Sequence, residues 1–324
     1  MIPIAITGTG SYIPEKVLTN DDLCRIVDTS DEWISTRTGI KERHIVTGEA
    51  TSDLAAAAAA QALATAGVKP EEVDLVVVAT VTPDRFTPTV SCLVQKKLGL
   101  KNATCLDLWA GCSGFIFSLM TAHRLMGSGS YQKALVIGAE SLTKVTNWKD
   151  RNTCVLFGDG AGAVVIEPGK MNGILNHITG SDGSRGDVLV IEGVAINNPA
   201  FQSAEMAHHI IMDGGEVFKF AVNAMNDSIM QVLEGTGLGL EEIDYFVPHQ
   251  ANDRIIELVA NKMKLPREKF YTNLHKYGNT SAASIPIALD EMNSKGMLQK
   301  GMKLITVGFG GGLTWGANLL QWVV

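Results

Sequence analysis

The residue with the most distinctive chemistry in this chain is Cys112, within CLDLWAGCSGFIF. Glycines stand close on both sides of it, between a predicted apolar strand over 104–108 and a predicted helix over 115–126. Such a turn would place the sulfur at a helix N-terminus, where unpaired N–H groups and the helix dipole favour an anion. Because the thiolate is the nucleophilic form of cysteine, the pattern predicts a nucleophile with a lowered pKa. A buried structural cysteine in a strand-to-helix turn is the alternative.

Three further segments carry groups that could work with a nucleophilic sulfur. His249, in PHQAN, follows a predicted buried strand, and a side chain at the carboxyl end of such a strand points towards a crevice. Asn279, in GNTSAAS, precedes a predicted helix over 282–293, although an ordinary turn and helix cap would use the same residues. Gly311 is the middle glycine of FGGG, whose N–H groups could approach a developing oxyanion; a tight hairpin turn is the alternative.

The composition excludes several classes of function. The 324 residues are 46% hydrophobic and 19% charged, which suits a large buried core and does not suit a disordered chain. A net charge of −7 argues against a general nucleic-acid binder. Five cysteines without CxxC spacing argue against a zinc site or a disulfide framework. With no visible signal peptide or membrane span, the sequence predicts a cytoplasmic protein without membrane, nucleic-acid or metal partners.

The chain also repeats itself. One match relates AGVKPEEVDLVVVAT to TGLGLEEIDYFVPHQ, 170 residues later (236 − 66), and another relates KALVIGAES to KLITVGFGG at the same offset. Alternating strands and helices predict an α/β class. We therefore predict two duplicated α/β halves related by a pseudo-twofold axis, residues 1–170 and 171–324, with Asn279 in the turn equivalent to that of Cys112. The other predicted elements are strands over 2–8, 75–80, 135–138 and 163–166, and helices over 21–27 and 51–66.

Four motifs, AGCSGF, PHQAN, GNTSAAS and FGGGLTWG, resemble those of the β-ketoacyl-acyl-carrier-protein synthase III family. These are the condensing enzymes that start type II fatty acid synthesis. The segments DTSDEWISTRTGIKERH, FGDGAGAVV and GGEVFKFAV fit the same family, so the resemblance covers the whole chain. It implies the thiolase fold, in which two duplicated halves form five layers, α-β-α-β-α.

The resemblance also implies a reaction, the decarboxylative Claisen condensation of an acyl-CoA with malonyl-acyl-carrier protein. Cys112 would carry the acyl group, and the products would be 3-oxoacyl-acyl-carrier protein, CoA and CO2. His249 and Asn279 would donate hydrogen bonds to the enolate oxygen of the malonyl thioester. The N–H groups of Cys112 and Gly311 would hold the oxyanion of the condensation step. A homodimer is implied, and acyl-CoA is a substrate, so that no cofactor is expected.

Residue-by-residue matching extends the resemblance to the binding sites. The implied coenzyme A site comprises Trp33, Arg37, Arg151, Gly214, Phe218, Ala251 and Asn252. Lys219 and Arg254 resemble a basic patch for the acidic carrier protein, which a chain of net charge −7 could still carry locally. Thr87 stands where some members have Phe, in a segment expected to close the acyl pocket of the partner subunit. The preferred length and branching of the acyl chain therefore stay open.

Several other proteins share part of this pattern. Thiolases usually use a second, C-terminal cysteine, and no cysteine follows Cys154. A polyketide-type synthase, or another condensing enzyme with a different acyl-CoA, remains an alternative. A papain-like hydrolase also has the order Cys, His, Asn, but needs surroundings like C-G-S-C-W, which are absent. A non-catalytic module that binds the carrier protein would not need an intact set of nucleophile, His, Asn and glycines.

Overall fold

Two β-sheets with matching strand order form the framework of the computed structural model, which describes residues 2–204 and 206–324. The first sheet has the order β1 (Ile4–Tyr12), β7 (Asp159–Pro168), β6 (Ala134–Ser141), β4 (Leu75–Ala79) and β5 (Thr104–Leu108). The second has the order β8 (Ile174–Ser181), β15 (Thr314–Gln321), β14 (Lys303–Gly310) and β13 (Tyr245–Pro248). In each sheet the first three strands are antiparallel to one another in turn, and the fourth strand is parallel to the third. A parallel bridge between Phe246 and Phe270 takes the place of β5 in the second sheet.

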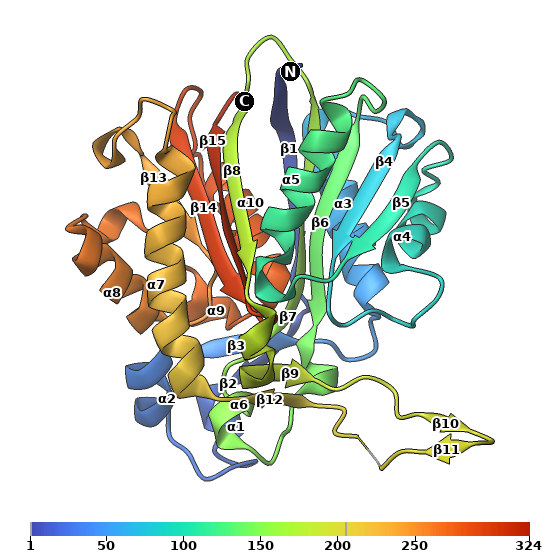
Figure 1. Ribbon diagram of the computed structural model, residues 1–324, viewed down its shortest axis with the longest axis vertical. Helices are drawn as coiled ribbons and strands as arrows, with labels where there is room; N and C mark the ends of the chain where they lie inside the picture. Colours follow the sequence, from blue (N-terminus) through green and yellow to red (C-terminus); the bar gives the residue numbers. More distant parts are fainter. Residues whose placement is uncertain (1, 205) are drawn as a thin grey trace.

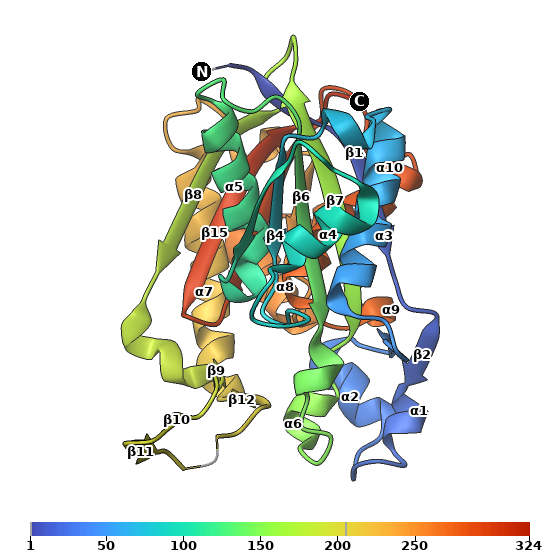
Figure 2. The same ribbon diagram turned by 90° about the vertical axis from the view of Figure 1, so that its right-hand side faces the viewer.

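The helices complete five layers, α-β-α-β-α, which confirms the thiolase arrangement that the resemblance implied. Between the two sheets lie α5 (Gly114–Met126) and α10 (Ser284–Ser294), as Figure 1 shows. The outer face of the first sheet is covered by α3 (Thr51–Ala66) and α4 (Val90–Leu98). The outer face of the second sheet is covered by α7 (Gly214–Leu233) and α8 (Asp253–Met263), and the turned view in Figure 2 shows the same stacking.

The equivalent elements keep the offset seen in the sequence. The strands β1 and β8 begin at Ile4 and Ile174, and the helices α5 and α10 begin at Gly114 and Ser284, each pair 170 residues apart. The 3-10 turns before these helices, Gly111–Ser113 and Ser281–Ala283, are likewise equivalent, so the counterpart of Cys112 is Ala282. The prediction that Asn279 lies in the turn equivalent to that of Cys112 is therefore wrong, because Asn279 precedes the Ser281–Ala283 turn. We propose that the two halves divide at residue 170, in the turn between β7 and β8.

Small residues explain how closely α3 packs on the first sheet. A Cβ atom on Gly8 of β1 would lie 2.4 Å from the Ala62 carbonyl oxygen, and one on Gly10 would lie 2.4 Å from that of Ala58. Both positions therefore require glycine, and the alanine run of α3 allows the approach. The helix begins at Thr51, and its N-cap is Ala50, whose N–H donates to the Asp53 carboxylate at 2.9 Å.

Shorter elements gather at the lower end of the two sheets in Figure 1, and a hairpin extends from there. They are β2 (Lys16–Thr19), α1 (Asn20–Leu23), α2 (Asp31–Thr38), β3 (Glu42–Ile45), α6 (Arg151–Cys154), β9 (Leu189–Ile191), β12 (Ile210–Met212) and α9 (Leu274–Tyr277). The hairpin of β10 (Asn197–Asn198) and β11 (Phe201–Gln202) projects away from the body in both views. The predicted strands correspond to β1, β4, β6 and β7, but the helix expected over 21–27 is shorter, because α1 ends at Leu23. No helix of the described residues could cross a bilayer, given their lengths and polarity.

Candidate active site

Backbone contacts between the two halves position Cys112. Its 3-10 turn packs on the glycines that follow β14: a Cβ atom on Gly111 would lie 2.7 Å from the Gly311 nitrogen. A Cβ atom on Gly310 would lie 2.4 Å from the Cys112 nitrogen. Gly111 also has a φ of +54°, which favours glycine. The glycines that the sequence analysis singled out are therefore needed for close approach, and the N–H groups of Cys112 and Gly311 belong to segments in contact.

The protonation state of Cys112 differs from the expectation. The lowered pKa predicted from the helix N-terminus is wrong for this structure, because burial raises the pKa of the thiol to about 12. A hydrogen bond with Ser281 acts in the opposite direction, and the nearby Glu140 carboxylate raises the pKa further. At neutral pH the sulfur is thus a thiol, and its attack on a thioester requires a group that takes the proton.

His249 follows β13 and is 1% exposed. Its Nδ1 lies 2.7 Å from the Ser284 hydroxyl, which itself accepts a hydrogen bond from the Gln250 N–H at 3.3 Å. Among the described residues, Nδ1 is the one acceptor within reach of the Ser284 hydroxyl, so the hydroxyl donates to Nδ1. An Nδ1 that accepts a hydrogen bond carries no proton, and we therefore assign the ring proton to Nε2. Burial lowers the pKa of His249 to about 3, so the ring is neutral. Its Nε2 is buried without a partner among the described residues, and can donate to an oxygen that enters the site.

Asn279 presents a second donor. Its backbone N–H donates to the Leu156 carbonyl at 2.8 Å, which fixes the residue beside β7. Its side-chain Oδ1 accepts a hydrogen bond from the Ser281 N–H at 2.8 Å. No hydrogen bond to its Nδ2 is found within the described residues, so this NH2 group is available to a ligand. Asn279 and His249 line the same cavity as Cys112, which brings the predicted Cys-His-Asn set together.

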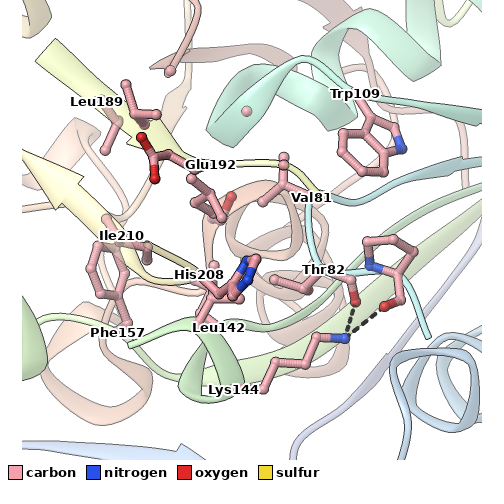
Figure 3. A pocket seen from close by; sticks show the side chains of 18 of the residues that line it. Val81, Thr82, Trp109, Leu142, Lys144, Phe157, Leu189, Glu192, His208 and Ile210 are labelled. Carbon is pink, nitrogen blue, oxygen red and sulfur yellow. Dashed lines mark hydrogen bonds between the residues drawn. The ribbon is translucent and has the colours of Figure 1, made fainter. Parts of the chain in front are cut away.

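Two cavities meet at Cys112. The larger, about 880 Å³, contains His249 and Asn279 and most of the predicted coenzyme A residues: Trp33, Arg37, Gly214, Phe218, Ala251 and Asn252. The smaller, about 500 Å³, is lined mainly by apolar side chains and includes Gly311. Figure 3 shows Leu142, Phe157, Ile210 and Trp109 around the smaller cavity, with Lys144 bonded to backbone carbonyls at one edge. Cys112 lines both cavities and is partly exposed.

Several of the predicted coenzyme A residues make contacts within the protein, and one of them, Arg151, lies outside the cavity lining. Arg151 does not line the larger cavity; its guanidinium lies 4.9 Å from the Trp33 ring centroid, and that of Arg37 lies 4.7 Å from the same ring. The two charges thus already lie against the Trp33 indole, which was predicted to belong to the coenzyme A site. Asn252 caps α8 by accepting from the Arg254 N–H, and its Nδ2 donates to the Arg37 carbonyl at 3.0 Å. Its amide is therefore engaged within the protein.

The residues predicted for the carrier protein and the acyl pocket line neither cavity. Lys219 on α7 is exposed and donates to Glu216 at 2.9 Å, so part of the patch charge is neutralised. Arg254 on α8 lies over the Phe218 ring, 5.7 Å from its centroid. Thr87 does not line the smaller cavity of its own chain, whereas the neighbouring Phe86 does. Among residues 2–204 and 206–324, no group of three or more His, Cys, Asp or Glu side chains is arranged to hold a metal ion.

Three residues at the site were missed by the sequence analysis: Ser281, Ser284 and Glu140. The two serines lie within GNTSAAS, so the motif contained them, but their roles follow from contacts with residues far along the chain. Glu140 is the penultimate residue of the run KALVIGAES, where a carboxylate in a mainly apolar strand was the available signal.

Comparisons with known proteins show the family to which this chain is related. Residues 106–183 match the model of the 3-oxoacyl-[acyl-carrier-protein (ACP)] synthase III family, and residues 233–322 match the model of its C-terminal part. A β-ketoacyl-[acyl-carrier-protein] synthase III of Clostridium acetobutylicum is 55% identical over 99% of each chain. One from Caldanaerobacter subterraneus is 52% identical, over 99% of this chain and 98% of the relative.

Solved structures show the same likeness. The crystal structure of 3-oxoacyl-[acyl-carrier-protein] synthase III from Aquifex aeolicus is 46% identical, with a TM-score of 0.92 over 98% of this chain and all of that one. The priming β-ketosynthase of a polyketide biosynthetic pathway is 35% identical, with a TM-score of 0.93 over 99% of this chain and 97% of that one. The chain therefore belongs to the 3-oxoacyl-[acyl-carrier-protein] synthase III family, the condensing enzymes of the acyltransferase class that initiate fatty acid synthesis.

Proposed function

We propose that this chain transfers the acyl group of an acyl-CoA to Cys112 and then condenses it with the malonyl group of malonyl-acyl-carrier protein. The products are 3-oxoacyl-acyl-carrier protein, CoA and CO2. The observation that carries the proposal is the position of Cys112 where the two cavities meet. The smaller, apolar cavity suits an acyl chain, and the larger one suits the pantetheine arm that presents either thioester.

The two donors of the larger cavity suit the decarboxylation step. Loss of CO2 from the malonyl thioester leaves an enolate, whose oxygen carries the developing charge. The Nε2–H of His249 and the NH2 group of Asn279 line the cavity and have no partner in the described part of the chain. Donors aimed at developing charge in a dry site are worth on the order of 10²–10³ in rate each. The enolate carbon then attacks the acyl-Cys112 carbonyl, whose oxyanion the N–H groups of Cys112 and Gly311 stabilise.

The same proposal includes a homodimer in the cytoplasm. Around the smaller cavity, Phe86, Trp109 and Val194 are 73%, 60% and 66% exposed. Large apolar side chains at an open cavity favour a cover, and a second copy of the chain would supply one, with Thr87 close to the contact. Acyl-CoA is a substrate and no cofactor takes part. Lys219 and Arg254 would steer the acidic carrier protein to the mouth of the larger cavity.

The test has two parts. Incubation with a panel of straight and branched acyl-CoA primers should add the mass of one acyl group to Cys112, and Cys112→Ser should remove this adduct. The acylated enzyme should then release CO2 from malonyl-acyl-carrier protein and form a 3-oxoacyl product. Acylation without condensation would refute the proposal. Efficient condensation with malonyl-CoA in place of the carrier protein would favour a polyketide-type synthase, and the likeness to a priming β-ketosynthase is the reason to include that arm.

A further inference from the structure

Ser281 has a backbone conformation that a residue with a side chain adopts only under constraint. Its φ is +49°, in the left-handed region, and it begins the 3-10 turn that precedes α10. In the described part of the chain, Lys264 is the other non-glycine residue with a positive φ. Lys264 ends α8, and a left-handed residue is common at the end of a helix. Ser281 lies at no such end, so its own contacts must stabilise this conformation.

The equivalent turn of the first half shows what this conformation requires. The counterpart of Ser281, 170 residues earlier (281 − 170), is Gly111, which begins the turn before α5. Its φ is +54°, so the two turns have nearly the same backbone conformation at this position. Glycine adopts a positive φ without strain because it has no Cβ atom. The second half has the same conformation with a serine, whose side chain must therefore be held in place.

Glu140 holds that side chain. The Ser281 hydroxyl donates to Glu140 Oε1 at 3.2 Å, and Glu140, near the end of β6, is 0% exposed. The Glu140 carboxyl group is itself fixed by donors of the turn after β4, namely Thr82 Oγ1 (2.6 Å), Thr80 Oγ1 (3.2 Å) and Val81 N (3.2 Å). A buried acceptor that is held on several sides is a rigid anchor for the serine hydroxyl.

The anchored backbone of Ser281 orients Asn279. The Ser281 N–H donates to Asn279 Oδ1 at 2.8 Å, which is the one hydrogen bond to that side chain within the described residues. Since an N–H donor is met by the amide oxygen, the NH2 group lies on the other side of the planar amide and is left for the larger cavity, which Asn279 lines. The angle φ is the rotation about the N–Cα bond, so it sets the direction of the Ser281 N–H relative to the hydroxyl and to α10. A negative φ would turn that N–H away from Asn279.

We propose that Ser281 and Glu140 are positioning residues for decarboxylation, which hold the Asn279 amide with its NH2 group turned towards the enolate oxygen. This inference rests on the proposed function, in which that NH2 group is one of two donors to the oxygen. The Glu140 carboxyl group fixes the Ser281 hydroxyl, the hydroxyl fixes the left-handed backbone, and the backbone N–H fixes the amide. The role therefore requires the backbone conformation of Ser281, and requires the hydroxyl only as the means of holding it.

Two substitutions of Ser281 separate the backbone from the hydroxyl. Ser281→Ala and Ser281→Gly both remove the hydroxyl, but glycine adopts the left-handed conformation without an anchor. Release of labelled CO2 from malonyl-acyl-carrier protein should fall about tenfold in Ser281→Ala, the effect of losing one hydrogen bond to a charged group. In Ser281→Gly it should stay within about threefold of the wild-type rate. Because both variants lack the hydroxyl, acylation of Cys112 should change equally in the two. Equal rates of CO2 release in the two variants would overturn the proposal.

Glu140→Gln tests the anchor itself. The Val81 N–H lies 3.2 Å from both carboxyl oxygens, so either orientation of the glutamine amide places an NH2 group against this donor and disturbs the anchor. Release of CO2 should fall about tenfold. Acylation should not slow, because the Glu140 carboxylate raises the pKa of the Cys112 thiol. Adding Ser281→Gly to Glu140→Gln should restore the release of CO2. A double variant as slow as Glu140→Gln, or an equal loss in both half-reactions of Glu140→Gln, would contradict the proposal.

Two control variants match these changes away from the site. Lys264→Gly also replaces a left-handed residue by glycine, and Lys264 lines neither cavity. Asp290→Asn also neutralises a buried carboxylate, which accepts hydrogen bonds from Thr9 and Ser11. Both controls should release CO2 at the wild-type rate.

Crystal structures of the variants give a second readout that needs no substrate. The contact between the nitrogen of residue 281 and Asn279 Oδ1, 2.8 Å in the wild type, should be lost in Ser281→Ala and kept in Ser281→Gly. A contact kept in both variants would overturn the positioning role. If the contacts change as expected but the wild-type enzyme releases no CO2 from malonyl-acyl-carrier protein, the proposed function is refuted and the positioning of Asn279 stands.

Discussion

The contact between Ser284 and His249 offers a direct test of how the site prepares its hydrogen-bond donor. Ser284→Ala removes the hydroxyl that bonds to Nδ1 at 2.7 Å, but leaves the imidazole itself in place. Without that hydroxyl, no hydrogen bond among the described residues satisfies the Nδ1 lone pair, so the proton can also occupy Nδ1 and the Nε2–H form loses its support. The donor that faces the larger cavity then becomes an acceptor, which repels an enolate oxygen.

The magnitude follows from the hydrogen bond lost. Such a bond contributes about 0.5–1.5 kcal/mol, and a buried polar atom left without a partner costs about 1–3 kcal/mol. Loss of about 1–2 kcal/mol of support for the Nε2–H form, the form that donates to the enolate, corresponds to a factor of about 5–30. We therefore expect Ser284→Ala to slow the release of CO2 from malonyl-acyl-carrier protein by about 5- to 30-fold. For comparison, His249→Ala should cost about 10²–10³, the usual effect of deleting an oxyanion donor.

The assay separates the two half-reactions. Release of labelled CO2 reports decarboxylation, and the intact mass of the enzyme with acetyl-CoA reports acylation of Cys112, which should change by less than about twofold. Ser118→Ala is the matched control, since its buried hydroxyl on α5 has no hydrogen-bond partner in the described part of the chain. Full decarboxylation activity in Ser284→Ala would refute the assignment of the tautomer. An equal loss in both half-reactions would show that the serine supports packing and not the donor.

Three other predictions follow from the geometry. His123 and His177 share a buried hydrogen bond of 2.8 Å, and burial lowers the pKa of each ring from 6.5 to about 4. Because the unfolded chain binds protons at a higher pH than the folded protein, the free energy of unfolding should fall as the pH drops from about 6.5 to 4. A free energy of unfolding that stays constant over this range in urea titrations would contradict the prediction. Gly310→Ala would place a Cβ atom 2.4 Å from the Cys112 nitrogen, so the rate of Cys112 acylation, measured by intact mass, should fall by about 10²-fold or more. A near-normal acylation rate would show that glycine is not needed for the close approach of the two backbone segments. Trp33→Ala should raise the KM for acyl-CoA about tenfold with little change in kcat, because stacking of an aromatic ring on the nucleotide base of coenzyme A is worth about 1–3 kcal/mol. An unchanged KM would show that Trp33 is not part of the coenzyme A site.

The sequence predicted the framework because burial leaves a strong local signal. The β-branched run of β4 and its counterpart in β13 are buried on both faces, and the shared offset of the repeats identified the duplication. Motif order also identified Cys112, His249 and Asn279, which the fold does bring to one cavity. These features depend on residues close together in the chain or on repeated spacing.

The electrostatics of the site could not be predicted in this way. The helix N-terminus before α5 suggested a lowered pKa for Cys112, but the dominant effect is desolvation by residues that are distant in sequence. The contact between Ser281 and Glu140 joins positions 141 residues apart, and no local pattern reports it. The wall of the smaller cavity was missed for a related reason, because β9 and β12 have three residues each, too few to show an alternating pattern.

The duplicated turns before α5 and α10 have one more consequence. Cys112 has Ala282 as its counterpart, and Gly114 has Ser284, so each half keeps a feature that the other lacks. One turn supplies the sulfur, and the opposite turn supplies the hydroxyl that orients the imidazole. The internal symmetry of the architecture is thus broken at the place where we propose that bonds are made. The proposed reaction centre therefore draws on both halves, and neither half separated from the other would contain all of its groups.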